Sequence, residues 1–164
     1  QANTPKPNTG SDSSASQPGN NELRLGSKQT TVAHDNDIFD RLARSKFRSR
    51  FRISAAERSY ANSKGRSTIL RHTKDFVAGR LAPAHPKNDG KQTPMRGHPA
   101  FVAQHATATC CRSCLKKWHG IDSGRPMTDA EQEKVVSLIM VWIDRQMRSG
   151  ARDQADRRSP GVGD

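Results

Sequence analysis

The sequence predicts a mainly α-helical, small single domain with disordered tails at both ends, and three observations support this fold class. Apolar residues recur at helical spacing in several segments between residues 35 and 148. Two of these segments open with a capping box, in which a hydroxyl and a carboxylate satisfy backbone N–H groups at a helix start. Residues 1–34 and 149–164 carry few large apolar side chains, so they cannot offset the entropy of ordering.

The first predicted element begins near Asp35, with Asp37 as a helix N-cap and the apolar residues Ile38, Phe39 and Leu42 near helical spacing. The segment that follows, residues 47–54 (FRSRFRIS), allows two interpretations. Its alternation fits a short strand with arginines on one side, and its aromatic residues also lie one helical turn apart.

The next predicted helix starts at the capping box Ser54–Glu57 and ends before Gly65. Another helix is predicted from about Ser67 to Arg80. It is followed by a long Pro- and Gly-rich loop over residues 83–99, which the prolines should keep ordered.

The helical stretch that follows the loop should begin at Pro99, because proline suits the first turn of a helix. The last predicted helix opens at the capping box Thr128–Glu131 and continues to Met147.

The stretch from His98 to His119 (HPAFVAQHATATCCRSCLKKWH) holds all three cysteines and three of the six histidines. On one continuous helix the cysteines would lie on an apolar stripe and pack as small core residues. If the helix breaks near residues 107–109, four side chains could hold a tetrahedral zinc ion, with an iron–sulfur or redox role as a further alternative. These predicted metal ligands are His105, Cys111, Cys114 and His119, and the neighbouring Cys110 and Cys111 leave open which is ligand and which is core.

The loop before this stretch is a second candidate site. It offers acid, base and cationic side chains that lead into a helix N-terminus, an arrangement suited to a phosphate or carboxylate. The candidate catalytic residues are Asp89, Lys91, Arg96 and His98, with His105 on the adjoining face. A solvated polar loop explains the same composition.

The formal net charge of +12 is unevenly distributed. Between Arg41 and Arg80 there are twelve Lys or Arg residues against two acidic ones, the pattern expected for binding a polyanion such as nucleic acid. The alternative is a solvated basic face. The residues expected to meet phosphates are Arg48, Arg50, Arg52, Arg66 and Arg71.

An odd number of cysteines, two of them adjacent, argues against a secreted disulfide framework and favours a reducing intracellular compartment, cytoplasmic or nuclear. No apolar run is long enough to span a bilayer, and the first thirty residues lack the apolar core of a secretory signal. A removed transit peptide and the oligomeric state stay open.

From Phe39 to Met147 the chain resembles an uncharacterised bacterial and fungal family catalogued as domain of unknown function 4186. The resemblance is carried by the segments KFRSRF, LAPAHPKNDGKQTPMRGHPAFVAQHATATCC, CLKKWHGI and LIMVWI. It implies that residues 35–148 form one complete domain with added tails, and it implies no activity. The leading hypothesis is therefore a zinc-binding intracellular protein that engages nucleic acid or another polyanion. An enzyme acting on a phosphorylated or other anionic substrate and a thiol redox protein are the alternatives.

Overall fold

The computed structural model describes the backbone of residues 37–158 and the side chains of residues 37–152. This described part is helical and contains no strand, which confirms the predicted fold class. Residues 37–43 form a first helical segment, and six further elements follow it. They are the 3₁₀ helix η1 (Arg48–Arg50), α2 (Ala55–Lys64), α3 (Arg66–Arg80), α4 (Pro99–Ala106), α5 (Arg112–His119) and α6 (Asp129–Arg158).

Both predicted capping boxes are present. The Ser54 hydroxyl accepts the Glu57 N–H at 3.3 Å, and the Glu57 carboxylate accepts the Ser54 N–H at 2.9 Å. Thr128 and Glu131 make the same reciprocal pair at 3.2 and 2.9 Å. Each box satisfies donors that a helix start would otherwise leave unpaired, which explains why the starts of α2 and α6 could be predicted from local sequence.

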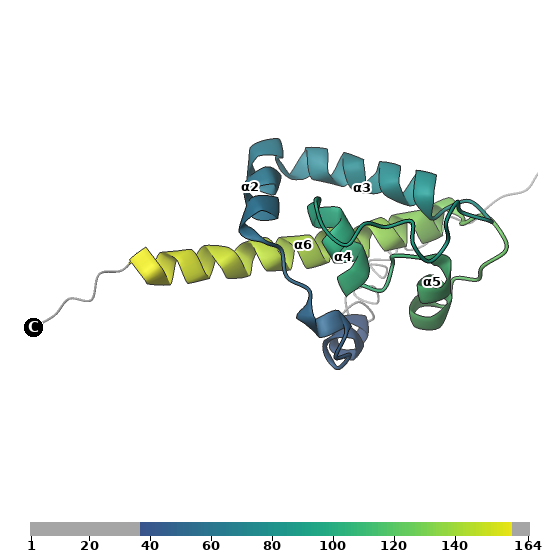
Figure 1. The fold of residues 1–164 in the computed structure, drawn as a ribbon, viewed down its shortest axis with the longest axis horizontal. Helices are drawn as coiled ribbons and strands as arrows, with labels where there is room; N and C mark the ends of the chain where they lie inside the picture. The colour runs from purple at the N-terminus through teal and green to yellow at the C-terminus, as the bar shows by residue number, and fades with distance from the viewer. Residues whose placement is uncertain (1–36, 159–164) are drawn as a thin grey trace, which may run out of the picture.

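The long helix α6 organises the domain (Figure 1). It runs across the whole view, with α3 alongside it and the short α4 packed against it. Its predicted apolar residues Val135, Ile139 and Ile143 are buried, since they line the face that α3 and α4 cover. The helix continues to Arg158, beyond the predicted boundary at residue 148. The rest of the predicted C-terminal tail, like the predicted tail at 1–34, lies outside the described residues.

Trp142 of α6 joins three separate groups of buried side chains. The largest group lies between α2, α3, α4 and α6, and a second surrounds Leu42 of the first helical segment. The third consists of Phe51, Val102 and Ala106. The half-buried indole of Trp142 packs against all three groups, so one side chain connects the N-terminal segment to the main core.

Two connecting segments, residues 48–54 and 83–98, contain no α-helix. Residues 48–50 form η1 and residues 51–54 continue without regular structure, so FRSRFRIS is neither a strand nor an α-helix. The loop over residues 83–98 contains only turns and bends, and the rest of the domain anchors it. Glu57 accepts the Gly97 N–H at 3.1 Å, and the Thr93 hydroxyl donates to the Cys110 carbonyl at 2.9 Å.

Arg112 is a charged side chain inside the core, with no exposed surface. The Nη1 and Nη2 groups of its guanidinium donate to main-chain carbonyls from two loops, and these acceptors replace the water that the two groups lose on burial. The acceptors are Leu81, Ala82, Pro83, Asp122 and Arg125. Arg112 therefore holds the end of α3 and the turn before α6 against the start of α5. No helix in the described part of the chain is long and apolar enough to cross a membrane.

Candidate metal centre

A break in the helix after α4 creates the arrangement of the cysteines. Ala108 is fully buried with a φ of +56°, a conformation that is unusual for a residue with a Cβ. Hydrogen bonds support the break, because Thr107 donates to the Ala103 carbonyl at 2.8 Å and Gln104 donates to the Thr109 carbonyl at 3.2 Å. The interpretation of residues 98–119 as one continuous helix was wrong, and the alternative with a break near residues 107–109 is observed.

This break brings the three cysteine sulfurs together. Cys110 and Cys111 precede α5, and Cys114 lies in its first turn. The three Sγ atoms all lie within 4.8 Å of one another, and those of Cys110 and Cys114 are 3.6 Å apart. Cys110 and Cys111 are buried, whereas Cys114 is half-buried. These three thiols could hold a metal ion, and Cys110 belongs to the group together with the predicted Cys111 and Cys114.

The guanidinium of Arg48 lies against these sulfurs. Its Nη2 donates to Cys114 Sγ at 3.1 Å, and its Nη1 lies 3.7 Å from Cys110 Sγ. The same Nη1 donates to the His105 carbonyl at 2.6 Å, which fixes the position of the side chain. A fixed positive charge at this distance stabilises negative charge on the sulfurs. Arg48, predicted to meet phosphates, thus faces the thiols in this structure.

Cys111 occupies the N-cap position of α5, where the helix dipole favours negative charge. Its Sγ lies 3.2 Å from the Ser113 hydroxyl. Donation from the thiols of Cys110 and Cys114, and from Ser113, lowers the pKa of Cys111. The hydrogen bonds of Cys110 to Cys111 and to Cys114, together with burial, raise the pKa of Cys110. The first proton therefore leaves the cluster more readily than the next, and the lowered pKa favours Cys111 as the site of that thiolate.

The two predicted histidine ligands are bonded elsewhere. The Nε2 of His105 lies 3.2 Å from the carbonyls of Thr93 and Pro94, and the Nε2 of His119 lies 2.8 Å from the Thr107 carbonyl. Because a carbonyl only accepts, each Nε2 carries the proton. Burial is the main cause that lowers the pKa of both rings. Within the described residues, neither ring joins the group of mutually close ligand atoms that the three thiols form.

Two of the four candidate catalytic residues of the loop lie at helix starts, and these starts belong to different helices. Asp89 accepts the backbone N–H of Arg112 at 3.1 Å, at the start of α5. His98 is the N-cap of α4, where its Nδ1 accepts the Ala100 N–H at 3.0 Å. Lys91 and Arg96 are exposed on the loop surface. Asp89 and His98 thus stabilise different helices, and their catalytic role stays a prediction.

A histidine pair lies beside the loop that the sequence did not indicate. His98 Nδ1 accepts a hydrogen bond, so its proton is on Nε2, which donates to His72 Nδ1 at 3.2 Å. Burial, and after it the neighbouring His72, lowers the pKa of His98 to about 4. The ring therefore stays neutral at pH 7. Rings of Tyr60, Phe76 and Phe101 surround it at centroid distances of 5.1 to 5.5 Å.

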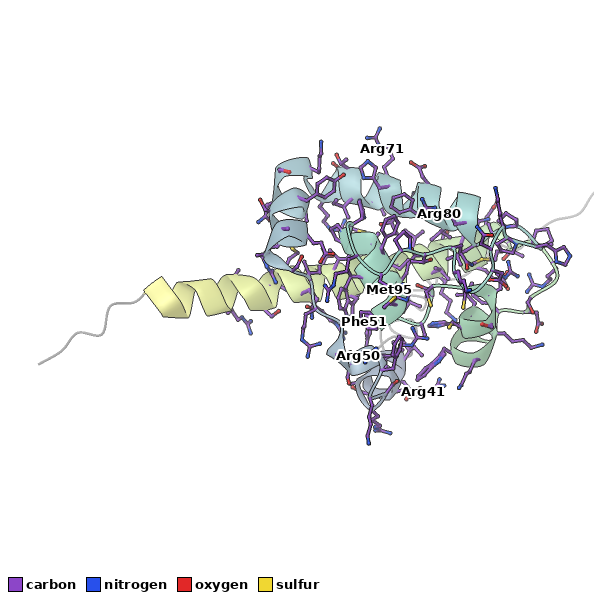
Figure 2. All side chains as sticks on the ribbon, viewed as in Figure 1. Arg41, Arg50, Phe51, Arg71, Arg80 and Met95 are labelled. Carbon is purple, nitrogen blue, oxygen red and sulfur yellow. The ribbon has the colours of Figure 1, made fainter. Side chains whose placement is uncertain are left out.

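The other arginines predicted to bind a polyanion are spread over the molecule. In Figure 2, Arg50 lies at the lower edge and Arg71 projects from α3 at the upper edge. Arg66 pairs with Asp144 at 3.0 Å, and Arg52 donates to the Ser49 carbonyl at 2.7 Å. These residues do not converge on one surface, and nucleic-acid binding by them stays a prediction.

The comparison with protein families covers most of the described domain. The model of the family described as Domain of unknown function (DUF4186) matches residues 36–144. The chain belongs to the DUF4186 family. The match contains the three cysteines, Arg48 and Arg112, so the thiol cluster lies within the DUF4186 domain. No solved structure matches this DUF4186 chain.

Sequence reasoning missed the partners of the thiol cluster in this DUF4186 domain. Arg48 is 66 residues from Cys114 along the chain, and nothing local in its segment distinguishes it from Arg50. On a continuous helix Arg112 would lie with His98, His105 and His119 on a face beside the apolar stripe of the cysteines, so no pattern in the sequence indicated that its guanidinium is buried.

Proposed function

We propose that Cys110, Cys111 and Cys114 bind one Zn²⁺ ion through three thiolates, and that this centre is the functional site of the domain. The observation that carries the proposal is the spacing of the sulfurs, all within 4.8 Å of one another. In a tetrahedral site with Zn–S bonds of about 2.3 Å, neighbouring sulfurs lie about 3.8 Å apart. The 3.6 Å between the Sγ atoms of Cys110 and Cys114 is close to this value.

The charge at the site also supports the proposal. Three thiolates and one Zn²⁺ leave a single negative charge, which is costly in a buried position unless it is paired. The guanidinium of Arg48 supplies one positive charge at hydrogen-bond distance from Cys114 and next to Cys110. The loaded centre would then be neutral as a whole. Hydrogen bonds to metal ligands of this kind also orient the ligands and tune the ion.

Three protein ligands leave the fourth position of a tetrahedral ion to water or a substrate. Zinc sites of this type act in catalysis, whereas structural sites take four protein ligands. Cys114 is the half-buried member of the three and gives the open side of the cluster. An ion held here would polarise a bound water or anion, and this is the chemistry that it would supply.

The same observations argue against a [4Fe–4S] cluster. Each thiolate of such a cluster binds a different iron, which separates the sulfurs more widely than one shared ion does. A thiol redox function is the second candidate, favoured by the 3.6 Å distance between Cys110 and Cys114 and by the lowered pKa of Cys111. In that case the pair would form a disulfide and the cluster would bind no metal.

Metal content measured by mass spectrometry on protein purified without chelators tests the proposal. We expect about one zinc per chain in the wild type and none in Cys111→Ser/Cys114→Ser. Ser113→Ala is the matched control, because it changes a neighbour of Cys111 without removing a ligand, and it should keep the ion. Cobalt substitution adds a check, since thiolate-bound Co²⁺ absorbs in the visible range.

Three other results would contradict the proposal, and each would assign the cysteines a different role. Iron with visible absorbance would indicate an iron–sulfur centre. An absence of metal, combined with a disulfide between Cys110 and Cys114 in mass spectra of alkylated protein, would support the redox function. An absence of metal with thiols that react only after denaturation would make the cysteines core residues.

A further inference from the structure

A second candidate site, which contains none of the three cysteines, lies at the C-terminal end of α5. A cleft of about 320 Å³ opens between the first helical segment, the end of α5 and the start of α6. Arg41, Lys116, Lys117 and Lys134 line it, together with the one carboxylate of Asp37. Its remaining walls are formed by Ile38, Trp118, His119, Gly120 and Leu138.

The positive charges in this cleft are poorly compensated. Within the described residues, Lys117 and Lys134 make no hydrogen bond or ion pair. Lys116 approaches Asp122 only to 4.0 Å, and both side chains are largely exposed, so this pair contributes little. Arg41 lies over the ring of Trp118 at 5.7 Å and keeps its charge at the cleft.

The positive charges at the cleft also affect the pKa of His119. Burial, and after it the charges of Lys134 and Arg41, lowers the pKa of this histidine. The ring is therefore neutral at pH 7 and adds no charge of its own. Four cations then face one carboxylate, a net excess that an anionic ligand would offset.

Helix dipoles explain only part of this arrangement. Lys116 and Lys117 lie in the last turn of α5, where a cation is favourable even without a ligand. Lys134 lies beyond the first turn of α6, where the dipole no longer contributes. It is nevertheless directed at the same cleft as the other cations, from a different element.

The other large cleft of the domain differs in this respect. It has a volume of about 360 Å³ and is lined by Arg48 and Arg52 among others. Arg48 donates hydrogen bonds to Cys114 Sγ and to the His105 carbonyl, and Arg52 donates to the Ser49 and Phe51 carbonyls. These two guanidinium groups have hydrogen-bond partners within the protein, whereas Lys117 and Lys134 of the first cleft have none in the described part of the chain.

We propose that the cleft between Arg41, Lys117 and Lys134 binds the phosphate or pyrophosphate group of a small ligand of nucleotide size. Ammonium and guanidinium groups from three elements surround one concave site, which suits a compact, highly charged anion. The volume lies in the lower range for small-molecule sites. Trp118, Ile38 and Leu138 supply apolar surface for the uncharged part of the ligand.

A small ligand fits better than a nucleic acid backbone. The cations gather in one concave site, while the arginines predicted to follow a polyanion are scattered over other faces, as Arg50 and Arg71 in Figure 2 show. A backbone would need a continuous basic track. This site shares no residue with the thiol cluster, so the proposal is independent of zinc binding.

Calorimetric titration of the full chain with inorganic pyrophosphate, and separately with adenosine diphosphate, tests the proposal. We expect saturable binding of at least one of them, weakened about tenfold or more in Lys117→Gln/Lys134→Gln, as expected when charged hydrogen-bond partners are lost. The matched control is Lys46→Gln/Lys74→Gln, which removes the same charge from exposed positions outside the cleft and should bind as the wild type does. Both pairs are exposed lysines, and circular dichroism confirms that each variant folds.

Three results would overturn the proposal. The first is an absence of binding by both probes at millimolar concentration. The second is equal weakening in the two double variants, which would indicate an effect of net charge alone. The third is binding of a single-stranded oligonucleotide when neither small probe binds, which would assign the cleft to a nucleic acid backbone.

Discussion

Arg48 Nη2 donates to the sulfur of Cys114 across 3.1 Å and thereby joins η1 to α5 over 66 positions of the chain. The neighbouring Arg50 offers a matched comparison. Both guanidinium groups pack over the ring of Phe47, at 4.9 and 4.5 Å, but only Arg48 makes a hydrogen bond to a sulfur. A substitution of Arg48 can therefore be compared with the same substitution of Arg50, which distinguishes the loss of the thiol contact from a general loss of positive charge.

Arg48→Met should weaken zinc binding about tenfold or more, because the thiolates lose a charged hydrogen bond that orients them. Arg50→Met should leave the affinity unchanged. Competition against a chromophoric chelator measures both constants. Equal affinities of the two variants would show that Arg48 does not act on the ion.

The cysteine cluster without metal should carry one thiolate well below the usual thiol pKa of about 8.5. Cys111 is the expected site, because the thiols of Cys110 and Cys114 and the Ser113 hydroxyl donate towards its sulfur and lower its pKa. Ultraviolet absorbance of the thiolate during a pH titration measures this. The low transition should disappear in Cys111→Ser and move upward in Ser113→Ala. A low transition that persists in Cys111→Ser would place the thiolate on another cysteine.

Acidification should destabilise the fold through His98. Its folded-state pKa of about 4 lies below the unfolded value near 6.5, so the unfolded chain binds more protons between these values. Above pH 6.5 the ring is neutral in both states and has no effect. As the pH falls from 6.5 towards 4, the free energy of unfolding should decrease by roughly 3 kcal/mol from this group, and the loss should level off below 4.

His98→Asn tests this dependence, because asparagine is a good N-cap and can still accept the Ala100 N–H, but does not titrate. Urea unfolding at several pH values should give a flatter profile for the variant than for the wild type. Parallel profiles would mean that other groups cause the acid sensitivity.

Arg112→Lys should destabilise the domain by about 3 kcal/mol or more, since an ammonium group cannot reach five carbonyls and stays buried with its charge. Arg125→Lys is the control, because it keeps the charge of an exposed ion pair with Glu131 and should leave the free energy of unfolding unchanged. Chemical denaturation compares the two. A similar stability of both variants would show that the buried guanidinium is dispensable.

The sequence predicted those features that depend on residues close together along the chain. The starts of α2 and α6 follow from hydroxyl–carboxylate pairs three residues apart, and the buried face of α6 follows from apolar spacing. The extension of the last helix to Arg158 was not predicted, because its final residues are polar and give no apolar period.

The details of the candidate site depended on contacts that local patterns do not contain. The helix break at Ala108 has no Gly or Pro to mark it, and hydrogen bonds made by the side chains of Thr107 and Gln104 support it. The break decides that Cys110 joins the other two thiols, a choice that the sequence left open. The position of Arg48 could not be predicted, because its partners lie in α4 and the cysteine segment.

The position of Trp142 has a consequence for how the domain melts. Its indole packs against all three groups of buried side chains. The unfolding of any one group therefore removes packing contacts from Trp142 and weakens the other two groups. Cooperative unfolding in one transition follows from such shared contacts. The N-terminal segment that carries Arg48 should then be lost together with the helices, and the thiol environment should disappear in the same step. Tryptophan fluorescence, helical circular dichroism and cysteine accessibility should therefore report one common melting curve.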